Sequence, residues 1–304
     1  MRQKYLVPEE QEDVRIDRYL AESCESLSRS YIQKLLKNGE VLVDGKAVKA
    51  SYRVCPGDQV LVDIPEAVQP EIQAQDMELD ILYEDSDVIL VNKPKGMVVH
   101  PAAGHLNDTL VNGLMAHCRD QLSGINGVMR PGIVHRIDMD TTGVLIACKN
   151  DFAHNQIAAQ LKEHSITRKY LAVVHGVIKE DEGTVDAPIG RHPVERKKMS
   201  VNEKNGRHAV THYRVLRRFS GYTYIECQLE TGRTHQIRVH MASIGHPLVG
   251  DEVYGPRKCP FSLQGQTLHA AVLGFIHPRT GEYLEFWAPL PEYFEKLLKK
   301  LENE

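Results

Sequence analysis

Several patterns that define common protein classes are missing from this sequence of 304 residues. No apolar run approaches the roughly twenty residues of a membrane-spanning helix, and the N-terminal stretch lacks the apolar segment of a secretory signal. The six cysteines are scattered without a C-x-x-C pair, which disfavours a disulfide framework or a structural zinc site. The phosphate-binding patterns G-x-G-x-x-G and G-x-x-x-x-G-K-[ST] are also absent. We therefore expect a cytoplasmic protein with reduced thiols, no membrane association and no nucleotide cofactor.

The chain also lacks an excess of positive charge, with a formal net charge of −4 at pH 7. Its charges are unevenly distributed, however. Residues 66–90 hold eight acidic side chains and no lysine or arginine, residues 15–53 carry eight basic against five acidic ones, and residues 186–258 carry thirteen against seven. A polyanion senses charge within about one Debye length, roughly 10 Å. The two basic regions are therefore compatible with RNA binding, and a merely solvated basic surface is the alternative interpretation.

Histidine is abundant, with fifteen residues, but its spacing does not indicate a metal site. His235 and His240 are five residues apart and would point in different directions on a helix. A zinc-protease helix needs two histidines four residues apart with a glutamate between them. We expect no bound metal, and we interpret the histidines as residues that cap, pack or contact RNA.

The patterning divides the chain into an N-terminal unit over residues 1–65, an acidic linker over residues 66–80 and a larger domain over residues 81–304. In the first unit, two stretches with helical spacing precede VLVDGKAV, which predicts two short strands around an Asp-Gly turn. In the larger domain single helices alternate with strands, and AVTHYRVLRRF and YTYIECQLE predict a long antiparallel pair. The expected fold class is α+β, with a mixed, mostly antiparallel sheet.

The stretch PGIVHRIDMDTTGVLIACK, residues 131–149, joins a cluster of charged side chains to an apolar, β-branched strand. Its central part, HRIDMDTTG at residues 135–143, is termed the charged loop. A buried strand holds such a loop rigidly, as a catalytic site requires. Arg136 and Asp138 alternate, so they are expected on one face of an extended segment. A solvated turn before a core strand is the alternative interpretation.

These residues also carry a resemblance to a known family. HRIDMDTTG resembles the HRLD-x-x-T-S/T-G signature of the RluA-type pseudouridine synthases, with Ile137 in place of leucine and Thr142 where serine also occurs. RKYLAVVHG and LETGRTHQIRVHMASIGHPLVGD resemble later signatures of that family, and KPKGMVVHPAAGH most resembles its ribosomal large-subunit synthase D branch. In the N-terminal unit, RSYIQKLLKNGEVLVDGK resembles the S4 RNA-binding domain. The likeness covers nearly the whole chain.

The resemblance implies an isomerase that converts specific uridines to pseudouridine in RNA, above all in 23S ribosomal RNA or the assembling large subunit, without a cofactor. It implies that Asp138 is the nucleophile and that Arg233 is the cation that keeps this carboxylate ionised. It implies that Tyr170 stacks on the target base and that Arg136 helps fill the place that the everted uridine leaves. In the S4-like unit it places three basic side chains near RNA phosphates: Arg29, Lys34 and Lys37.

The chemistry of the residue types agrees with these roles. An ionised carboxylate can add to the base or assist departure at the sugar, and both modes of attack stay open. A carboxylate in a dry pocket takes up a proton unless a cation holds it ionised, and a guanidinium suits that task because it stays charged and can meet both oxygens. A phosphate contact or a structural salt bridge is the alternative for Arg233, and a packed core position is the alternative for Tyr170.

Two other functions compete with the isomerase. A non-catalytic RNA-binding or ribosome-assembly factor on the same scaffold would have no need of a carboxylate beside RNA phosphates. A hydrolase based on aspartate and histidine would need a G-x-S-x-G elbow or a metal triad, and the sequence contains neither pattern.

Overall fold

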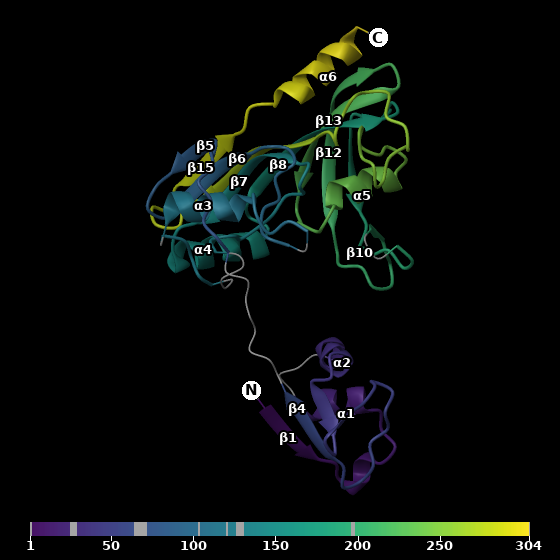
Figure 1. The fold of residues 1–304 in the computed structure, drawn as a ribbon. Helices are drawn as coiled ribbons and strands as arrows, with labels where there is room; N and C mark the ends of the chain where they lie inside the picture. The colour runs from purple at the N-terminus through teal and green to yellow at the C-terminus, as the bar shows by residue number, and fades with distance from the viewer. Residues whose placement is uncertain are drawn as a thin grey trace. The chain divides into compact units, whose positions relative to one another are not determined.

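The computed structural model describes residues 2–24, 29–63, 72–102, 104–119, 121–125, 131–195 and 198–303. Its contacts divide the chain into two compact units, Met1–Pro70 (the small unit) and Glu71–Glu304 (the large unit). Within the described ranges, no helix combines the length and the apolar character needed to cross a membrane. Figure 1 shows the elements of each unit.

The small unit packs two helices against a small antiparallel sheet of strand order β1-β4-β2-β3. The expected Asp-Gly turn between the two short strands is present, with Asp44 and Gly45 both at positive φ, as a tight hairpin turn requires. The first strand was not predicted, because its polar composition hides the pairing of its backbone with β4. The elements are β1 (Arg2–Leu6), the 3₁₀ helix η1 (Glu9–Gln11), α1 (Ile16–Ser23), α2 (Arg29–Lys37), β2 (Val41–Val43), β3 (Lys46–Ala47) and β4 (Gln59–Asp63).

A buried carboxylate joins the two helices of the small unit. The Asp17 side chain is fully buried and accepts hydrogen bonds from Arg15, Arg29 and Gln33. Burial opposes ionisation of Asp17, but these three donors outweigh it and lower its pKa to about 2. Arg29 therefore has a structural ion pair, whereas Lys34 is exposed on the same helix.

The large unit is built on one mixed sheet with strand order β5-β6-β7-β14-β8-β13-β12-β9, in which β15 also pairs with β14. Only the β7–β14 pair is parallel among these neighbours, so the sheet is mostly antiparallel, as predicted. The predicted long pair is confirmed as β12 and β13. The elements are β5 (Ile81–Glu84), β6 (Val88–Lys93), α3 (Leu110–Cys118), β7 (Thr142–Cys148), α4 (Asp151–Lys162), β8 (Thr167–His175), β9 (Glu182–Asp186), β10 (Ile189–Arg191), β11 (Met199–Val201), β12 (Val210–Phe219), β13 (Tyr222–Leu229), α5 (Gln236–Ser243), β14 (Leu268–Ile276), β15 (Tyr283–Trp287) and α6 (Glu292–Glu302).

The later part of the segment predicted as an acidic linker, residues 66–80, belongs to the large unit. Residues 66–71 lie outside the described residues, but residues 72–80 pack on α3 of the large unit. Ile72 is buried in the core of that unit, the Gln75 amide donates to the carbonyl of Asn112, and the side-chain amide of Asn112 donates to Gln73. The acidic composition concealed these contacts, because they depend on a few apolar side chains and on the backbone.

The centre of the sheet carries the charged loop. Every residue of β7 is buried, and it pairs on one side with β6 and on the other with β14. Gly143, the second residue of this strand, has a φ of +109°, and Ala270 of β14 is its parallel partner. A β-carbon at Gly143 would overlap the backbone carbonyl of Ala270. Close approach of the two backbones therefore requires glycine where the loop enters the sheet.

We expect the substitution Gly143→Ala to lower the free energy of unfolding by at least about 3 kcal/mol, because it adds backbone strain to overpacking. Gly281→Ala is the matched control: Gly281 also has a positive φ, +72°, but nothing lies within 4 Å of the added carbon. Its cost should stay near 1–2 kcal/mol, as roughly expected for the backbone conformation alone. Urea unfolding followed by circular dichroism measures both values. Equal losses in the two variants would contradict the close approach of β7 and β14.

Candidate active site

The charged loop is held at its first residue and at its middle by hydrogen bonds to the surrounding structure. At its start, the Nε2 of His135 accepts a hydrogen bond from the backbone amide of Ile146 in β7, at 3.1 Å. Farther along, the carbonyl of Met139 accepts a hydrogen bond from the buried ammonium of Lys93, at 2.9 Å. Asp138 lies between these two attachments, so its backbone has little freedom to move away from the site.

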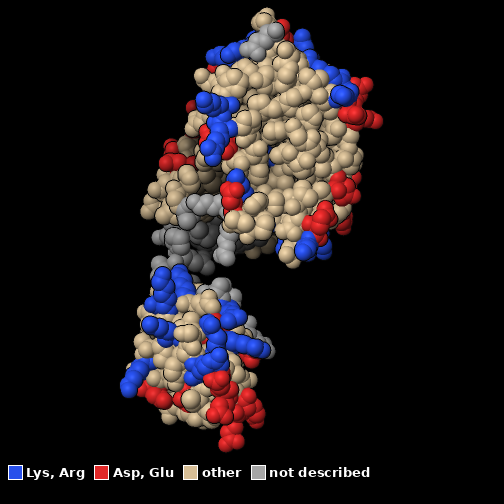
Figure 2. Space-filling model, turned by 90° about the vertical axis from the view of Figure 1, so that its right-hand side faces the viewer, with Lys and Arg blue, Asp and Glu red and all other residues tan. Residues whose placement is uncertain are grey.

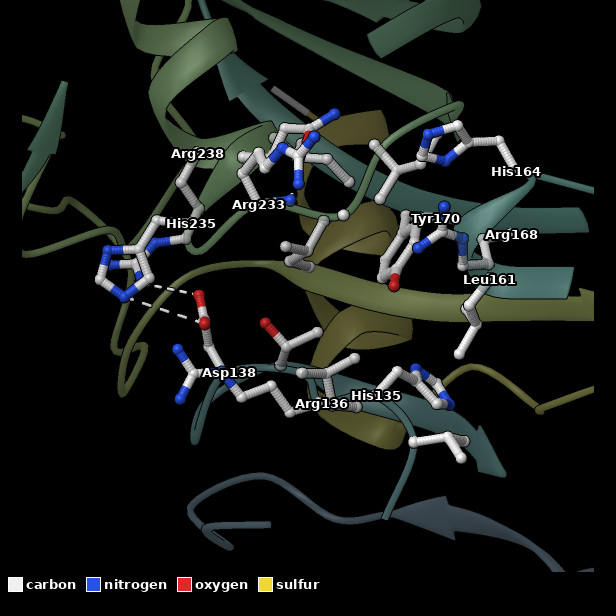
Figure 3. A pocket seen from close by; sticks show the side chains of 18 of the residues that line it. His135, Arg136, Asp138, Leu161, His164, Arg168, Tyr170, Arg233, His235 and Arg238 are labelled. Carbon is white, nitrogen blue, oxygen red and sulfur yellow. Dashed lines mark hydrogen bonds and ion pairs between the residues drawn. The ribbon is translucent and has the colours of Figure 1, made fainter. Parts of the chain in front are cut away.

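The carboxylate of Asp138 forms an ion pair with Arg238 of α5. The Arg238 Nη1 lies 2.9 Å from the Asp138 Oδ2, and Figure 3 shows the two side chains pointing toward each other. The same guanidinium donates its Nε and Nη2 to the two oxygens of Asp251, at 2.7 and 3.0 Å. Asp251 is fully buried and Arg238 nearly so, whereas Asp138 keeps a quarter of its side chain exposed. The guanidinium is thus held from behind by one carboxylate and presents its remaining edge to the other.

Burial disfavours the charge on Arg238, but hydrogen bonding and attraction from Asp251 and Asp138 outweigh it and raise its pKa above the ordinary arginine value. Arg238 therefore stays positive at every pH at which the protein folds. The Asp138 carboxylate therefore has a permanent cation as its hydrogen-bonding partner.

The prediction that Arg233 is the ion-pair partner of Asp138 is wrong. The Nε of Arg233 donates to the carbonyl of His208 at 2.9 Å, and its backbone amide donates to the Gln236 side chain. The reason is where the helix begins: α5 starts at Gln236, so Arg238 lies in its first turn and faces the charged loop, while Arg233 precedes it. Arg233 still lines the pocket that contains Asp138.

The pairing of Arg238 with an acidic residue could have been expected from the sequence, although a motif comparison does not reveal it. Arg238 stands in a helix where Ile237, Val239 and Met241 are also buried, and a buried arginine needs a carboxylate partner. That requirement points to an acidic residue that is itself in an apolar context.

His235 is a further neighbour of Asp138 that was not predicted for the site. Its Nε2 lies 3.8 Å from the Asp138 Oδ1, and its Nδ1 lies 2.9 Å from the hydroxyl of Tyr254. Burial lowers the pKa of His235, against the attraction of Asp138, so the imidazole is neutral at pH 7. It therefore does not compete with Arg238 as the cation of the site.

The predicted residues Tyr170 and Arg136 line the same pocket, which has a volume of about 450 Å³. Tyr170 projects from β8 with 8% of its surface exposed, and burial raises the pKa of its hydroxyl. Arg136 is exposed, and its guanidinium donates to the hydroxyl of Thr234 at 3.0 Å. The structure therefore brings together Asp138, Tyr170 and Arg136, with the cation supplied from α5.

One cluster of potential metal ligands occurs among the described residues, outside this pocket: Asp85, Asp87 and His277. Arg279 donates to both oxygens of Asp87, and His277 pairs with Asp85 at 2.8 Å. The guanidinium neutralises the site that a cation would need, so the cluster is an ion-pair network of the fold.

Comparisons with known proteins give a consistent result. Residues 87–243 match the family model of RNA pseudouridylate synthases, and residues 14–60 match that of the S4 domain. The chain is 60% identical over 293 residues to the uncharacterized RNA pseudouridine synthase YlyB of Bacillus subtilis, covering 96% of each chain. It is 48% identical to the ribosomal large subunit pseudouridine synthase D of Zymomonas mobilis, covering 94% of this chain and 93% of the relative. The solved structure of human RNA Pseudouridylate Synthase Domain Containing 1 aligns with a TM-score of 0.58 at 26% identity, covering 75% of this chain and 96% of that one.

The ion-pair arrangement predicts a large loss of stability when Arg238 is replaced and almost none when Arg233 is replaced. Arg238→Gln should lower the free energy of unfolding by about 3–5 kcal/mol, because it leaves the buried Asp251 without its counter-charge. Arg233→Gln should change it by no more than about 0.5 kcal/mol. Urea unfolding measures both, and the double variant Arg238→Gln/Asp251→Asn should lose less than the sum of its single changes. Equal effects of the two arginine variants would refute the assignment.

The burial of His135 predicts a dependence of stability on pH. Burial, with repulsion from Arg168 adding to it, lowers the pKa of His135 from 6.5 to about 3. The unfolded chain therefore binds this proton first as the pH falls, and stability is lost below about pH 6.5. Between pH 6 and 4, the wild type should lose about 1.4 kcal/mol more per pH unit than His135→Gln. The exposed His105→Gln serves as the control and should follow the wild type in urea unfolding across this range.

Proposed function

The chain belongs to the RNA pseudouridylate synthase family and carries an S4 domain, and from this premise we propose that it isomerises uridines of 23S ribosomal RNA with Asp138 as the nucleophile and without a cofactor. Membership of the family confirms the resemblance in the sequence, the expected α+β fold and the isomerase class. The finer points, namely the target RNA and the residue that attacks, are the substance of the proposal.

The observation that carries the proposal is the ion pair of Asp138 with Arg238 at 2.9 Å, in a pocket that also contains Tyr170. Isomerisation of uridine breaks a C–N bond and forms a C–C bond with no net redox change. A carboxylate that is kept ionised in such a pocket can attack the sugar or the base. Arg238 holds one oxygen of this carboxylate in the pocket, and the exposed quarter of the Asp138 side chain can meet a substrate.

The other residues of the pocket have roles consistent with an everted uridine. Tyr170 offers a ring on which the base can stack, an interaction worth about 1–3 kcal/mol. Arg136 lies on the same loop as Asp138 and is exposed, so it can occupy the position that the base leaves in the RNA. Arg233 lines the pocket and is not the partner of Asp138, so its guanidinium can contact a phosphate at the edge of the pocket.

Ribosomal RNA as the substrate is supported by the relatives and by the S4 domain. Synthase D of Zymomonas mobilis, as its name states, acts on the large ribosomal subunit. Figure 2 shows lysine and arginine side chains gathered on one face of the small unit. Arg18 and Arg53 are among the exposed basic residues of this unit. Such a face can make the phosphate contacts that position an RNA without reading its sequence. The cytoplasm, where ribosomal RNA is modified, is the corresponding location.

A non-catalytic RNA-binding factor remains the second candidate, because the S4 domain alone would favour RNA binding. The ion pair distinguishes the two. Asp17 and Asp251 pair with arginines for structural reasons and are fully buried, whereas Asp138 keeps a quarter of its side chain exposed in the pocket, as a group that attacks a substrate must.

We expect Asp138→Asn to reduce pseudouridine formation by at least about 10³-fold, because the amide cannot act as a nucleophile. The measurement is incubation with a 23S rRNA transcript followed by mapping of carbodiimide-resistant adducts. RNA binding in a filter assay should be retained. The control Asp186→Asn removes a carboxylate that is 62% exposed and should keep full activity.

Mapping of pseudouridines in the 23S rRNA of a deletion strain identifies the target positions in the cell. Sites that disappear in the deletion strain should return with the wild-type gene and not with Asp138→Asn. If Asp138→Asn restores them, the protein acts as a binding factor and the catalytic proposal is rejected.

A further inference from the structure

Arg168 is a buried cation of the pocket that has no carboxylate partner among the described residues. Only 6% of its surface is exposed. Its Nη2 donates to the carbonyl of Glu230 at 3.1 Å, while its Nε is buried with no hydrogen-bond partner in the described part of the chain. Arg238, the other buried arginine of the pocket, has two carboxylates. An isolated buried charge is costly, so the guanidinium of Arg168, with a vacant donor and no carboxylate, indicates a ligand that offsets its charge.

The position of Arg168 places that vacant donor at the end of the pocket away from the ion pair. Arg168 and Tyr170 are two residues apart on β8, so both side chains project from the same face of the sheet. Figure 3 shows them on the side of the pocket opposite Asp138 and Arg238. Burial raises the pKa of Tyr170, the charge of Arg168 opposes this and that of Asp138 adds to it. Both charges therefore act on the tyrosine hydroxyl, in opposite directions.

The wall beside the guanidinium is made of backbone. A β-carbon at Gly232 would lie 2.6 Å from the Nη1 of Arg168, so any side chain at this position would displace the guanidinium. Glycine at this position leaves the guanidinium the space that it occupies in the wall of the pocket.

We propose that Arg168 binds a carbonyl oxygen of the target uracil and stabilises the negative charge that the base acquires when its bond to the sugar breaks. The inference rests on the proposed function. A base stacked on Tyr170 with its sugar toward Asp138 has C4 and its oxygen O4 on the opposite edge of the ring. That edge faces Arg168.

A cation at this edge would stabilise the charge that develops on the base. The C1′–N1 bond breaks, and its electron pair leaves with the base, so the uracil ring becomes an anion whose charge spreads over N1, O2 and O4. After the base turns over, C5 forms a bond to C1′ with that pair, C5 loses its proton and N1 gains one. A carboxylate that has added to C1′ or to C6 is released in the same sequence, so the atoms balance in either mode. A preorganised donor at a developing oxyanion is the kind of group that lowers such a barrier.

The same contact suits both orientations of the base. Rotation of uracil about its N3–C6 axis exchanges N1 with C5 and O4 with O2. The edge that presented O4 before rotation therefore presents O2 afterwards, and both are carbonyl oxygens. A guanidinium, which only donates hydrogen bonds, binds either one without rearrangement.

The depth of Arg168 favours the base over an RNA phosphate. Arg136, Lys162 and His164 are exposed residues that line the same pocket, and a phosphodiester outside the pocket meets them first. Arg168 has only 6% exposure, which a flat base edge can reach and a tetrahedral phosphate flanked by two sugars cannot.

The first measurement is the single-turnover rate of pseudouridine formation, with enzyme in excess, for wild type, Arg168→Met and Arg168→Lys. Arg168→Met should lower the rate by about 10²-fold, the loss expected for one oxyanion donor. RNA affinity in a filter assay should change less than about twofold, as expected for an interaction made mainly in the transition state. Arg168→Lys keeps a charge and should fall between the two. The control Arg214→Met removes a strand arginine that is 61% exposed and should react at the wild-type rate.

The second measurement tests the contact itself. A short RNA containing the mapped target is synthesised with a single 4-thiouridine at that position, because sulfur accepts hydrogen bonds more weakly than oxygen. The ratio of the uridine rate to the 4-thiouridine rate should be at least about tenfold larger for the wild type than for Arg168→Met, since a hydrogen bond to a charged donor is involved. If Arg168→Met does not fold, the same comparison with Arg168→Lys decides.

The outcomes separate this inference from the proposed function. Absence of pseudouridine with the wild-type enzyme on any 23S rRNA would reject the proposed function. An active wild type with equal rate ratios in all variants would reject the contact with the base alone. Coupling to a phosphorothioate next to the target, without coupling to 4-thiouridine, would assign Arg168 to the phosphate instead. Loss of RNA affinity and folding in parallel with the rate would assign it a structural role through Glu230.

Discussion

The site depends on one buried guanidinium held between two carboxylates. Arg238 uses two nitrogens on Asp251 and one on Asp138, so its donors are matched to acceptors on both sides. The cost of burying these charges is offset only because the geometry is close to ideal, and Asp251 also accepts the backbone amides of Val253 and Tyr254. Every other feature of the pocket has to fit around this arrangement, because none of the three groups can move without exposing another to an apolar environment.

The sheet fixes the distance between the two charged ends of the pocket. Asp138 lies on the charged loop that leads into β7, and Arg168 lies on β8; both strands pair with β14. One end of the pocket therefore has a guanidinium held between two carboxylates, and the other has a cation without a carboxylate partner among the described residues. A ligand that develops negative charge between the two ends would be favoured by this asymmetry, as the isomerisation of uridine requires.

The small unit uses the same physical device for a different purpose. Asp17 is buried and holds Arg15 and Arg29, as Asp251 holds Arg238 in the large unit. In the small unit the pairing joins two helices, so part of its basic charge is structural. The exposed lysines, including Lys34, are then the groups available to RNA. A count of basic residues overestimates the charge that a polyanion meets.

The sequence by itself determined the family, the α+β fold, the S4 domain and the loop that carries Asp138, because each depends on local patterns of apolar and charged residues. Only the tertiary structure decided which arginine meets Asp138. Arg233 and Arg238 occur in one short motif, and the choice depends on where α5 begins and on a contact between residues 100 positions apart. For the same reason the sequence did not reveal that residues 72–80 of the predicted linker pack on α3. It also did not reveal the vacant donor of Arg168, because that depends on which groups surround it in space. Local patterns report the propensity of a segment, whereas partners in space are set by packing.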